Sequence, residues 1–382
     1  MKFFHLSDLH IGKTVNGFSM LGEQKHVFDQ VIEYVKTERP AAVVIAGDVY
    51  DRPIPGVESV QVFDDFITTL AGQDTAVILI SGNHDSPERM SYASRLLSEK
   101  RLFFYGTFNR ELRKIVLPDE YGDVNFWLLP FIKPASVRGM FGEKEIESHE
   151  DAVAVALESV EIDDDARNVL VSHQFYTKSG VPSVRSESEL NPVGGLDAVD
   201  AGLIEQFDYA ALGHLHGQQS VGAKHIRYCG SPIKYSFSEW RHIKSITVVE
   251  LKEKGKCSIE TLPLVPLYEM REIKGPIETL MSDEVSSLAN KDDYLRVILT
   301  DEEEIIDPMG KLRSVYPNVM SLDFENPRTN IESDTSIQGT ETRANLSHFD
   351  LFCDFLNTVH KLVMTEEQTE IVRELLEKGE EE

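Results

Sequence analysis

Cysteine is scarce in this chain, with three residues among 382, namely Cys229, Cys257 and Cys353. An odd and sparse set of cysteines argues against a disulfide framework and favours a reducing compartment. No apolar run approaches the roughly 20 residues that a membrane-spanning helix needs. A strand-like apolar segment begins within the first residues, so we expect no signal peptide. Together these features predict a cytoplasmic protein without a membrane anchor.

Basic residues are also in short supply, because 38 Lys and Arg stand against 65 Asp and Glu and give a formal net charge of −27. Proteins that bind nucleic acid usually carry a basic patch, so the charge alone favours a small substrate. However, residues 301–382 hold a net charge of −13, nearly half of the excess. The alternative is that metal ions neutralise a site locally while a partner protein supplies most contacts to phosphates.

A glycine-rich phosphate loop of the form G-x-x-x-x-G-K-S/T is missing from the sequence. Such a loop cradles the phosphates of a nucleotide and reaches them with its lysine. Its absence excludes ATP hydrolysis of that type by this chain. Any dependence on ATP would have to come from a partner.

Five short motifs of Asp, Asn and His stand in order along the first 220 residues, and each follows a short apolar run typical of a buried strand. They are Asp8-Leu9-His10, Gly47-Asp48, Gly82-Asn83-His84-Asp85, His173 and Gly213-His214-Leu215-His216. Open α/β sheets place their ligands at the carboxyl ends of the strands. One isolated histidine is most often an ordinary core or surface residue, but five such sites at strand ends predict a common metal centre.

The residue types suggest individual roles. Asp8 and His10 are two residues apart, so in an extended segment both would leave the same face. Asp48 has two carboxylate oxygens and can bridge two cations. Asn83 offers a neutral amide oxygen to a metal, which leaves the adjacent His84 for the substrate and Asp85 to orient it.

The full candidate ligand set is Asp8, His10, Asp48, Asn83, His173, His214 and His216. A pair of divalent cations held in this way can clamp a phosphodiester and activate water against it. Four imidazoles argue against a pure Mg²⁺ or Ca²⁺ site, but they do not choose among Mn, Fe, Co and Zn.

The length of the chain suggests two or three domains. Strands alternate with helices over the first 250 residues, which predicts α/β layers. We expect helices at residues 23–38, 57–70 and 88–97, then a small α+β module with strands at 267–273, 294–299 and 319–324 and helices at 277–288 and 308–315. The predicted boundaries are a phosphoesterase domain at 1–260, a second domain at 264–325, a linker at 326–345 and a helical tail at 346–382.

Apolar and aromatic residues recur at helical spacing in the tail. The residues that we expect to bind a partner there are Phe349, Phe352, Phe355, Leu356 and Val359. An amphipathic helix behind a polar linker needs a surface to bury against. A partner protein is favoured because docking onto the chain's own domains would not require a linker, although that alternative stays open.

A polar loop rich in Ser, Gly and Pro is expected at residues 181–195. Arg185 within it could approach a substrate, although a single exposed arginine is usually just solvated.

The segments HLSDLHIGK, AGDVYDRP, SGNHDSPERM, SHQF, ALGHLHG and CGSPIKYSFSE resemble the SbcD family, nuclease subunits within the calcineurin-like metallophosphoesterases. The resemblance covers residues 1 to about 250. It implies a four-layer α/β sandwich, that is, two stacked sheets flanked by helices. It places Asp8, His10, Asp48 and His216 on one metal and Asp48, Asn83, His173 and His214 on the other. It also implies Mn²⁺ as the metal and makes His84 the catalytic histidine that is not a ligand.

The same resemblance implies a function. It predicts a 3′→5′ exonuclease on double-stranded DNA and an endonuclease on hairpins and blocked ends, in DNA repair, recombination and replication. It predicts an SbcC-type ATPase as partner of the tail, a homodimer within a heterotetramer, and a capping domain at residues 264–325. Two rivals stay open: a phosphatase or phosphodiesterase acting on a small substrate, and a non-catalytic tether for DNA ends.

Overall fold

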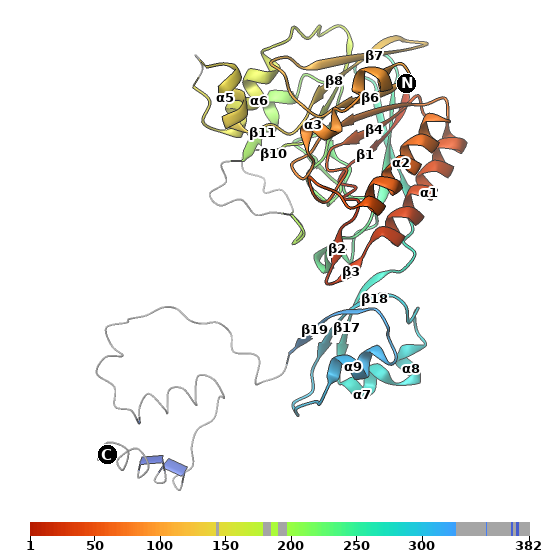
Figure 1. The fold of residues 1–382 in the computed structure, drawn as a ribbon, viewed down its shortest axis with the longest axis vertical. Coiled ribbons are helices and arrows are strands. Elements are labelled where there is room, and N and C mark those ends of the chain that lie inside the picture. Colours follow the sequence, from red (N-terminus) through yellow and green to blue (C-terminus); the bar gives the residue numbers. More distant parts are fainter. Residues whose placement is uncertain are drawn as a thin grey trace. The chain divides into compact units, whose positions relative to one another are not determined.

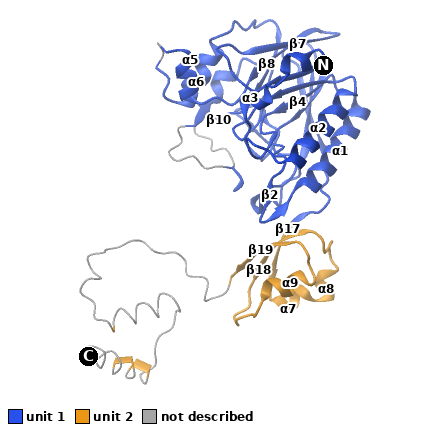
Figure 2. Ribbon diagram, in the orientation of Figure 1, with its two compact units in different colours: residues 1–270 blue, residues 271–382 orange. Residues whose placement is uncertain are grey.

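The computed structural model describes residues 1–142, 145–178, 185–189 and 197–325, together with Phe349, Gln368, Thr369, Val372 and Arg373. The chain forms two compact units, Met1–Met270 and Arg271–Glu382 (Figure 2). Across the described residues, no helix combines the length and the apolar character needed to cross a membrane. Most of the predicted linker and tail lies outside the described residues, so those two boundaries stay predictions.

The first sheet of unit 1 has six strands in the order β16-β15-β1-β4-β5-β6. The strands are β1 (Lys2–Leu6), β4 (Ala42–Ala46), β5 (Ala76–Ile80), β6 (Leu102–Tyr105), β15 (Ser245–Leu251) and β16 (Cys257–Pro263). The four strands from β1 to β6 in this order are parallel, and β15 and β16 extend the sheet antiparallel. Parallel strands share one carboxyl edge, so the segments after β1, β4 and β5 emerge together.

The second sheet also has six strands, in the order β13-β14-β12-β9-β8-β7. Its strands are β7 (Arg113–Asp119), β8 (Gly122–Leu129), β9 (Arg167–Ser172), β12 (Tyr209–Leu212), β13 (Gln219–Val221) and β14 (Ala223–Tyr228). The central four, from β14 to β8, are parallel. The segments after β9 and β12 therefore leave from the same edge of this sheet.

The two sheets pack face to face over a core of fully buried side chains. Phe3 from the first sheet contacts Phe126 and Tyr209 from the second, with ring centroids 5.4 and 5.8 Å apart. Helices α1 (Leu21–Glu38) and α2 (Val57–Ala71) lie side by side in Figure 1, and Phe28 stacks on Phe66 between them. Helices α5 (Pro134–Met140) and α6 (His149–Leu157) contribute to a second core with strands of the second sheet. The predicted four-layer α/β architecture is confirmed.

Short elements complete unit 1: β2 (Thr14–Val15), β3 (Phe18–Ser19), β10 (Phe175–Thr177), β11 (Ala198–Asp200) and the 3-10 helices η1 (Ala201–Ile204) and η2 (Phe237–Glu239). The expected helix at residues 88–97 is two short helices, α3 (Pro87–Met90) and α4 (Ser94–Ser98). The break lies at Ala93, whose φ of 56° is left-handed and ends the regular helical turn. Helical spacing in the sequence did not reveal this local departure.

Unit 2 is a three-stranded sheet with short helices, as the sequence predicted in outline. Its strands are β17 (Met270–Gly275), β18 (Tyr294–Leu299) and β19 (Val319–Phe324), and its helices are α7 (Ile277–Met281), α8 (Asp283–Ser286) and α9 (Pro308–Arg313). The expected helix at residues 277–288 divides at Ser282, which has an extended backbone and whose side chain caps α8. Asp307 caps α9 ahead of Pro308, because its side chain accepts the backbone N–H of Gly310.

Candidate metal centre

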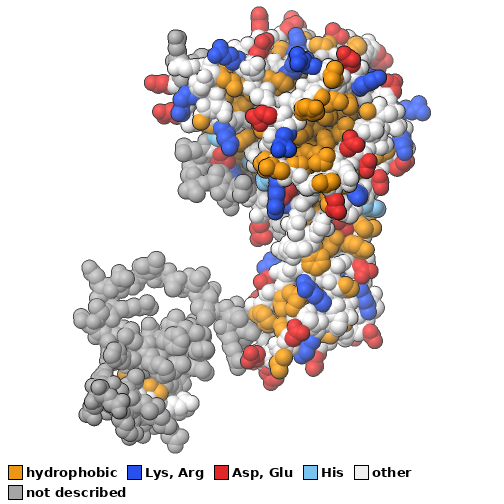
Figure 3. Space-filling view, in the orientation of Figure 1, with side chains coloured by type: hydrophobic (Ala, Val, Ile, Leu, Met, Phe, Trp, Pro, Cys, Tyr) orange, Lys and Arg blue, Asp and Glu red, His pale blue; other side chains and the backbone are white. Residues whose placement is uncertain are grey.

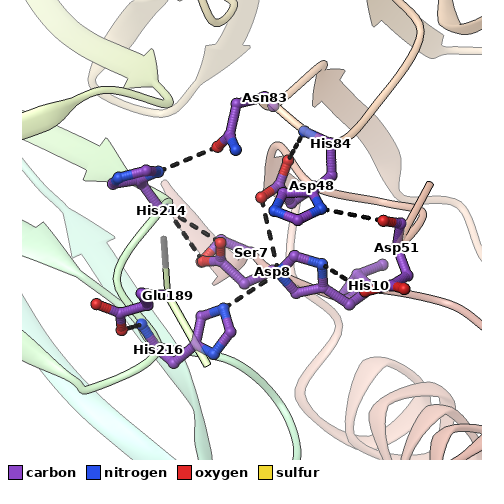
Figure 4. A network of polar contacts seen from close by, with 12 residues as sticks. Ser7, Asp8, His10, Asp48, Asp51, Asn83, His84, Glu189, His214 and His216 are labelled. Carbon is purple, nitrogen blue, oxygen red and sulfur yellow. Dashed lines mark hydrogen bonds and ion pairs between the residues drawn. The ribbon is translucent and has the colours of Figure 1, made fainter. Parts of the chain in front are cut away.

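The five motifs meet at one end of the sandwich, where the carboxyl ends of the parallel strands of both sheets lie. The loops after β1, β4 and β5 carry Asp8, Asp48 and Asn83, while the loops after β9 and β12 carry His173 and His214. In Figure 4 the side chains from both sheets point toward one another across the gap between the strand ends. Residues more than 200 positions apart are thereby brought into contact, since Asp8 accepts the backbone N–H of His214 at 3.0 Å.

The backbone is strained at four of the predicted ligands. Asp8, His10, Asp48 and His214 have φ angles of 55°, 41°, 51° and 109°, values that side-chain-bearing residues rarely adopt. Asp8 and His10 are thus not in an extended segment, and the expected alternation of faces is wrong as the reason for their convergence. Left-handed turns aim both side chains inward, and such strain, on the order of 1–3 kcal/mol per residue, collects at functional sites.

Two glycines allow the loops to approach each other. Gly47 has a φ of 89°, and a Cβ there would lie 2.4 Å from Nδ1 of His173. A Cβ on Gly82 would lie 2.1 Å from Oδ1 of Asp48. Both contacts are far below any permitted carbon distance, so glycine is required at each position if the ligands are to meet.

One half of the centre is formed by Asp8, His10 and His216. Each of them offers one ligand atom, and the three atoms lie within 4.8 Å of one another. The two Nε2 atoms of His10 and His216 are only 3.1 Å apart. Two buried imidazole nitrogens facing each other at this distance are well placed to share a cation.

The other half is formed around Asn83. Its Oδ1 lies 3.1 Å from Nε2 of His173 and 3.1 Å from Nδ1 of His214. Oδ2 of Asp48 lies 3.3 Å from Nε2 of His173 and 3.6 Å from Nε2 of His10. Asp48 therefore faces both halves with a single carboxylate, which is the geometry that a bridging ligand needs.

The electrostatics of the centre fit a cationic occupant. Asp8 and Asp48 are both buried, and burial raises the pKa of Asp8. Burial also acts to raise the pKa of Asp48, but His173 beside it outweighs this and holds the pKa well below its usual range. Burial lowers the pKa of His10 well below its usual value, which favours the neutral ring that a metal requires.

His173 pairs with Asp48 in this arrangement. Burial acts to lower the pKa of His173, but the charge of Asp48 overcomes it and raises the pKa to about 9. Without a metal, a protonated His173 therefore supplies positive charge beside Asp48. A divalent cation bound there would displace this proton. Two buried carboxylates, one amide oxygen and four imidazoles suit two divalent ions with open coordination positions.

One side of the centre is accessible to solvent. Asp8, His10, Asp48 and His173 are buried, whereas Asn83, His84 and His214 are only half-buried. Nδ1 of His84 donates to the backbone carbonyl of Asp51 at 3.0 Å, so Nε2 is the nitrogen left to face a substrate. The backbone N–H of His84 also donates to Oδ1 of Asp48 at 2.8 Å. His84 is thus held beside Asp48. Together with His10 and Asp48 it forms a further group whose possible ligand atoms lie within 4.8 Å of one another, so its role as a non-ligand stays a prediction.

The observed hydrogen bonds of Asp85 are to backbone amides and not to the ring of His84. Its carboxylate accepts the backbone N–H groups of Val49, Tyr50 and Gly82, at 3.1, 2.9 and 2.9 Å. Burial, and then the neighbouring charge of Asp48, raises its pKa to about 6. Asp85 therefore joins the two loops that carry Asp48 and Asn83, and the orientation of the His84 ring comes from the carbonyl of Asp51.

Sequence reasoning missed several residues that support the ligands. Gln24 at the start of α1 donates to the carbonyl of His10 at 2.7 Å and to the hydroxyl of Tyr235 at 3.0 Å. Ser7 donates to Asp8 at 2.5 Å. Tyr235 lies in the CGSPIKYSFSE segment, so the resemblance was a signal for it. Nothing in the spacing of Gln24 distinguishes it from an ordinary helix residue.

Arg185 is not a freely solvated side chain. Its guanidinium lies 3.6 Å from the ring centroid of Phe175, and Nη2 lies 3.3 Å from Oδ2 of Asp197. The ring centroid of Phe175 is 6.1 Å from that of His214. The positively charged guanidinium of Arg185 is therefore held near the candidate metal centre. Residues 181–184 and 190–195 of this predicted loop lie outside the described residues.

Two family models match the chain. The model described as calcineurin-like phosphoesterase matches residues 1–218, and the model described as Type 5 capsule protein repressor C-terminal domain matches residues 266–360. The first match contains every predicted ligand. The second begins close to the division between the two units and reaches into the predicted tail.

Curated relatives share most of their length with this chain. The SbcD subunit of the nuclease SbcCD from Staphylococcus epidermidis is 34% identical over 325 residues, which are 84% of this chain and 85% of the relative. The protein of the same name from Staphylococcus saprophyticus is 34% identical over 326 residues, 84% of each chain. Among solved structures, GAP50, the anchor in the inner membrane complex of Plasmodium, has a TM-score of 0.41 and 12% identity, over 84% of this chain and 96% of that one.

Proposed function

Because the chain belongs to the calcineurin-like phosphoesterase family and, within it, to the SbcD nuclease subunits, we propose that it is a Mn²⁺-dependent DNA nuclease. As a member it is a metal-dependent phosphodiesterase. The activities that we assign are 3′→5′ exonuclease action on double-stranded DNA and endonuclease action on hairpins and blocked ends, in repair and recombination. The observation that carries the proposal is the meeting of all seven predicted ligands at one edge of the sandwich.

Two divalent cations at this centre would polarise the phosphate and activate a water molecule for in-line attack. Asp8, His10 and His216 would hold one ion, and Asn83, His173 and His214 the other. Asp48 would contact both, because its Oδ2 lies within 3.6 Å of histidine nitrogens on each side. The half-buried Asn83, His84 and His214 define the side from which the phosphate approaches.

His84 acts on the leaving group in this proposal. Its Nδ1–H is already given to the carbonyl of Asp51, so a protonated ring presents Nε2–H to the substrate side. Breaking the P–O bond leaves an alkoxide, and a nearby proton donor stabilises that oxygen as charge develops. The hydrogen bond from the backbone N–H of His84 to Asp48 keeps this donor close to the carboxylate that would bridge the two metals.

The nuclease assignment is tested against a small-substrate phosphatase. We expect the chain with Mn²⁺ to degrade linear duplex DNA, and to open end-blocked duplex DNA when its ATPase partner and ATP are added. Gel analysis of both substrates, with and without partner and ATP, measures this. Hydrolysis of p-nitrophenyl phosphate esters without cleavage of either DNA under any condition would replace the proposal with the small-substrate rival.

We further propose an SbcC-type ATPase as the partner of the tail. The guanidinium of Arg373 lies 4.9 Å from the ring centroid of Phe349, which supports a contact within the predicted helical tail. Phe352, Phe355, Leu356 and Val359 lie outside the described residues, so their part in binding stays a prediction. Residues 264–325 would serve as the capping domain, and a hydrophobic core of their own that includes Leu295, Val297 and Val319 supports this assignment.

Removal of the tail tests this assignment. A chain that ends at residue 345 should lose co-purification with the ATPase and keep its Mn²⁺ binding, because every metal ligand lies before residue 217. Affinity capture of the co-expressed pair and metal analysis of the bound fraction measure the two properties. Capture at the level of the full chain would move the contact to another surface.

A homodimer within a heterotetramer is the remaining partner assignment. Tyr92 and Leu96, in and beside the short helices α3 and α4, are 81% and 70% exposed. A neighbouring groove is lined by aromatic and arginine side chains, among them Phe103, Phe104 and Arg95. Figure 3 shows a broad apolar patch on this face of unit 1. Exposed apolar area of this kind favours a protein contact.

A further inference from the structure

His216 differs from His84 and His173 in how its second ring nitrogen is held. His173 and His84 donate Nδ1–H to backbone carbonyls, those of Ala46 and Asp51. Nδ1 of His216 instead lies 2.8 Å from the hydroxyl of Ser188. That hydroxyl lies 2.7 Å from Oε1 of Glu239, which is fully buried. Nδ1 of His216 also lies 3.5 Å from the same Oε1, so the shorter hydrogen bonds between this predicted metal ligand and the buried carboxyl group run through Ser188.

The direction of these hydrogen bonds follows from Lys244. Its Nζ lies 2.6 Å from Oε2 of Glu239, in a pair that is almost wholly removed from water. A carboxylate paired with an ammonium group can only accept, so Ser188 donates its O–H to Glu239. The oxygen of Ser188 then accepts Nδ1–H from His216. This order leaves the lone pair on Nε2 of His216, which is the nitrogen that faces His10.

The pair of Glu239 and Lys244 has further hydrogen-bond partners besides Ser188 and the His216 ring. Lys244 also donates to the backbone carbonyl of His216 at 2.9 Å and to Ser231 at 2.8 Å. Oε1 of Glu239 accepts from Ser236 at 3.1 Å. A buried ion pair is costly unless further hydrogen bonds satisfy both partners, and here they do. These contacts hold the carboxylate of Glu239 in one position, from which it can orient His216.

We propose that Glu239, acting through Ser188, sets the tautomer and orientation of His216 and so strengthens metal binding on that side of the centre. Both are positioning residues, since neither faces the substrate side. The inference rests on the two-metal site of the proposed function and adds a determinant of its affinity. Ser188 lies in the described segment 185–189, and its hydroxyl makes the shortest side-chain link between the His216 ring and Glu239.

Metal titration of matched variants tests the relay. Outer groups that orient a histidine ligand are typically worth about 10–100-fold in metal affinity. Isothermal titration of the full chain with Mn²⁺ should show one of two ions bound about 10–100-fold more weakly in Ser188→Ala and in Glu239→Gln, with the other ion unaffected. Ser188→Thr keeps a hydroxyl in place and should restore the wild-type affinity.

Glu189 provides a control at the same place. Its Oε1 accepts the backbone N–H of His216 at 2.6 Å, so it contacts the same residue without touching the ring. Glu189→Gln should therefore keep both affinities, and thermal melting of each metal-free variant will show whether it folds. Should Glu239→Gln fail to fold because Lys244 is left unpaired, the contrast between Ser188→Ala and Ser188→Thr still decides the matter.

The outcomes separate this inference from the proposed function. Wild-type affinity for both ions in Ser188→Ala would overturn the relay while leaving the metal centre intact. An equal loss in Glu189→Gln would also overturn it, because packing of the segment would then explain the effect. A wild-type chain that takes up no Mn²⁺ at all would overturn the two-metal site, and the relay with it.

Discussion

His84→Gln is expected to lower the rate of duplex DNA cleavage by about 10²–10⁴-fold, the usual contribution of a positioned acid or base. Glutamine has similar reach and an amide that can still donate to Asp51, but it cannot deliver a proton to the leaving oxygen. Both metal ions should stay bound, because the ring of His84 is turned toward the substrate by its bond to the Asp51 carbonyl. Cleavage rates and bound metal per chain are the two measurements.

The leaving group provides a sharper comparison for His84. A p-nitrophenyl ester of a nucleotide releases an anion that is stable without a proton, so the variant should lose far less activity on that ester than on DNA. His26→Gln, on the half-buried surface of α1, is the matched control and should behave as the wild type on both. An equal loss on DNA and on the ester would contradict the acid role.

Asp48→Asn is expected to lose at least one metal ion and more activity than the ~10–100-fold that removal of an outer supporting group costs. Asparagine can still accept the backbone N–H of His84 with its Oδ1, which in the wild type lies 2.8 Å away. It cannot supply the negative charge that two cations share. The metal-free variant should unfold at a lower temperature than the metal-free wild type, because it loses the buried pairing of Asp48 with His173.

Thermal unfolding with and without Mn²⁺ measures this second effect. A ligand that binds only the folded state stabilises it by about 2.7 kcal/mol at a concentration of 100 Kd, so Mn²⁺ should raise the melting temperature of the wild type. The same addition should do much less for Asp48→Asn. Asp123→Asn, at an exposed position of β8, serves as the control. A full Mn²⁺-dependent rise in Asp48→Asn would remove Asp48 from the centre.

The sequence predicted long regular elements well and short irregular ones poorly. Helix α1 and strands such as β4 have continuous apolar patterns that the structure follows closely. Residues 88–97 and 277–288 share such patterns, yet each divides at one residue, Ala93 or Ser282. A single residue of left-handed or extended backbone changes the path of the chain without changing the periodicity, so pattern alone cannot locate it.

For the candidate site, the sequence predicted which residues take part but not how the backbone positions them. The motifs identified which residues would be near a metal, because five sets of His, Asp and Asn, each directly after a buried strand, are expected to meet at the strand ends. The reason given for the convergence of Asp8 and His10 was wrong, since both have positive φ. The contacts of Asp85 with three backbone amides were also not visible from the sequence.

By itself, the sequence determined the layered α/β class, the ligand types and the reaction class, because these follow from local patterns and from the chemistry of side chains. Only the tertiary structure shows how the candidate ligands are brought together, since contacts such as that between Asp8 and His214 join residues 206 positions apart. The same holds for Ser188 and Lys244, which lie outside every quoted motif, and for Glu239, whose segment CGSPIKYSFSE does not reveal its contact with Ser188. Their roles arise from burial beside His216, and burial depends on the fold as a whole.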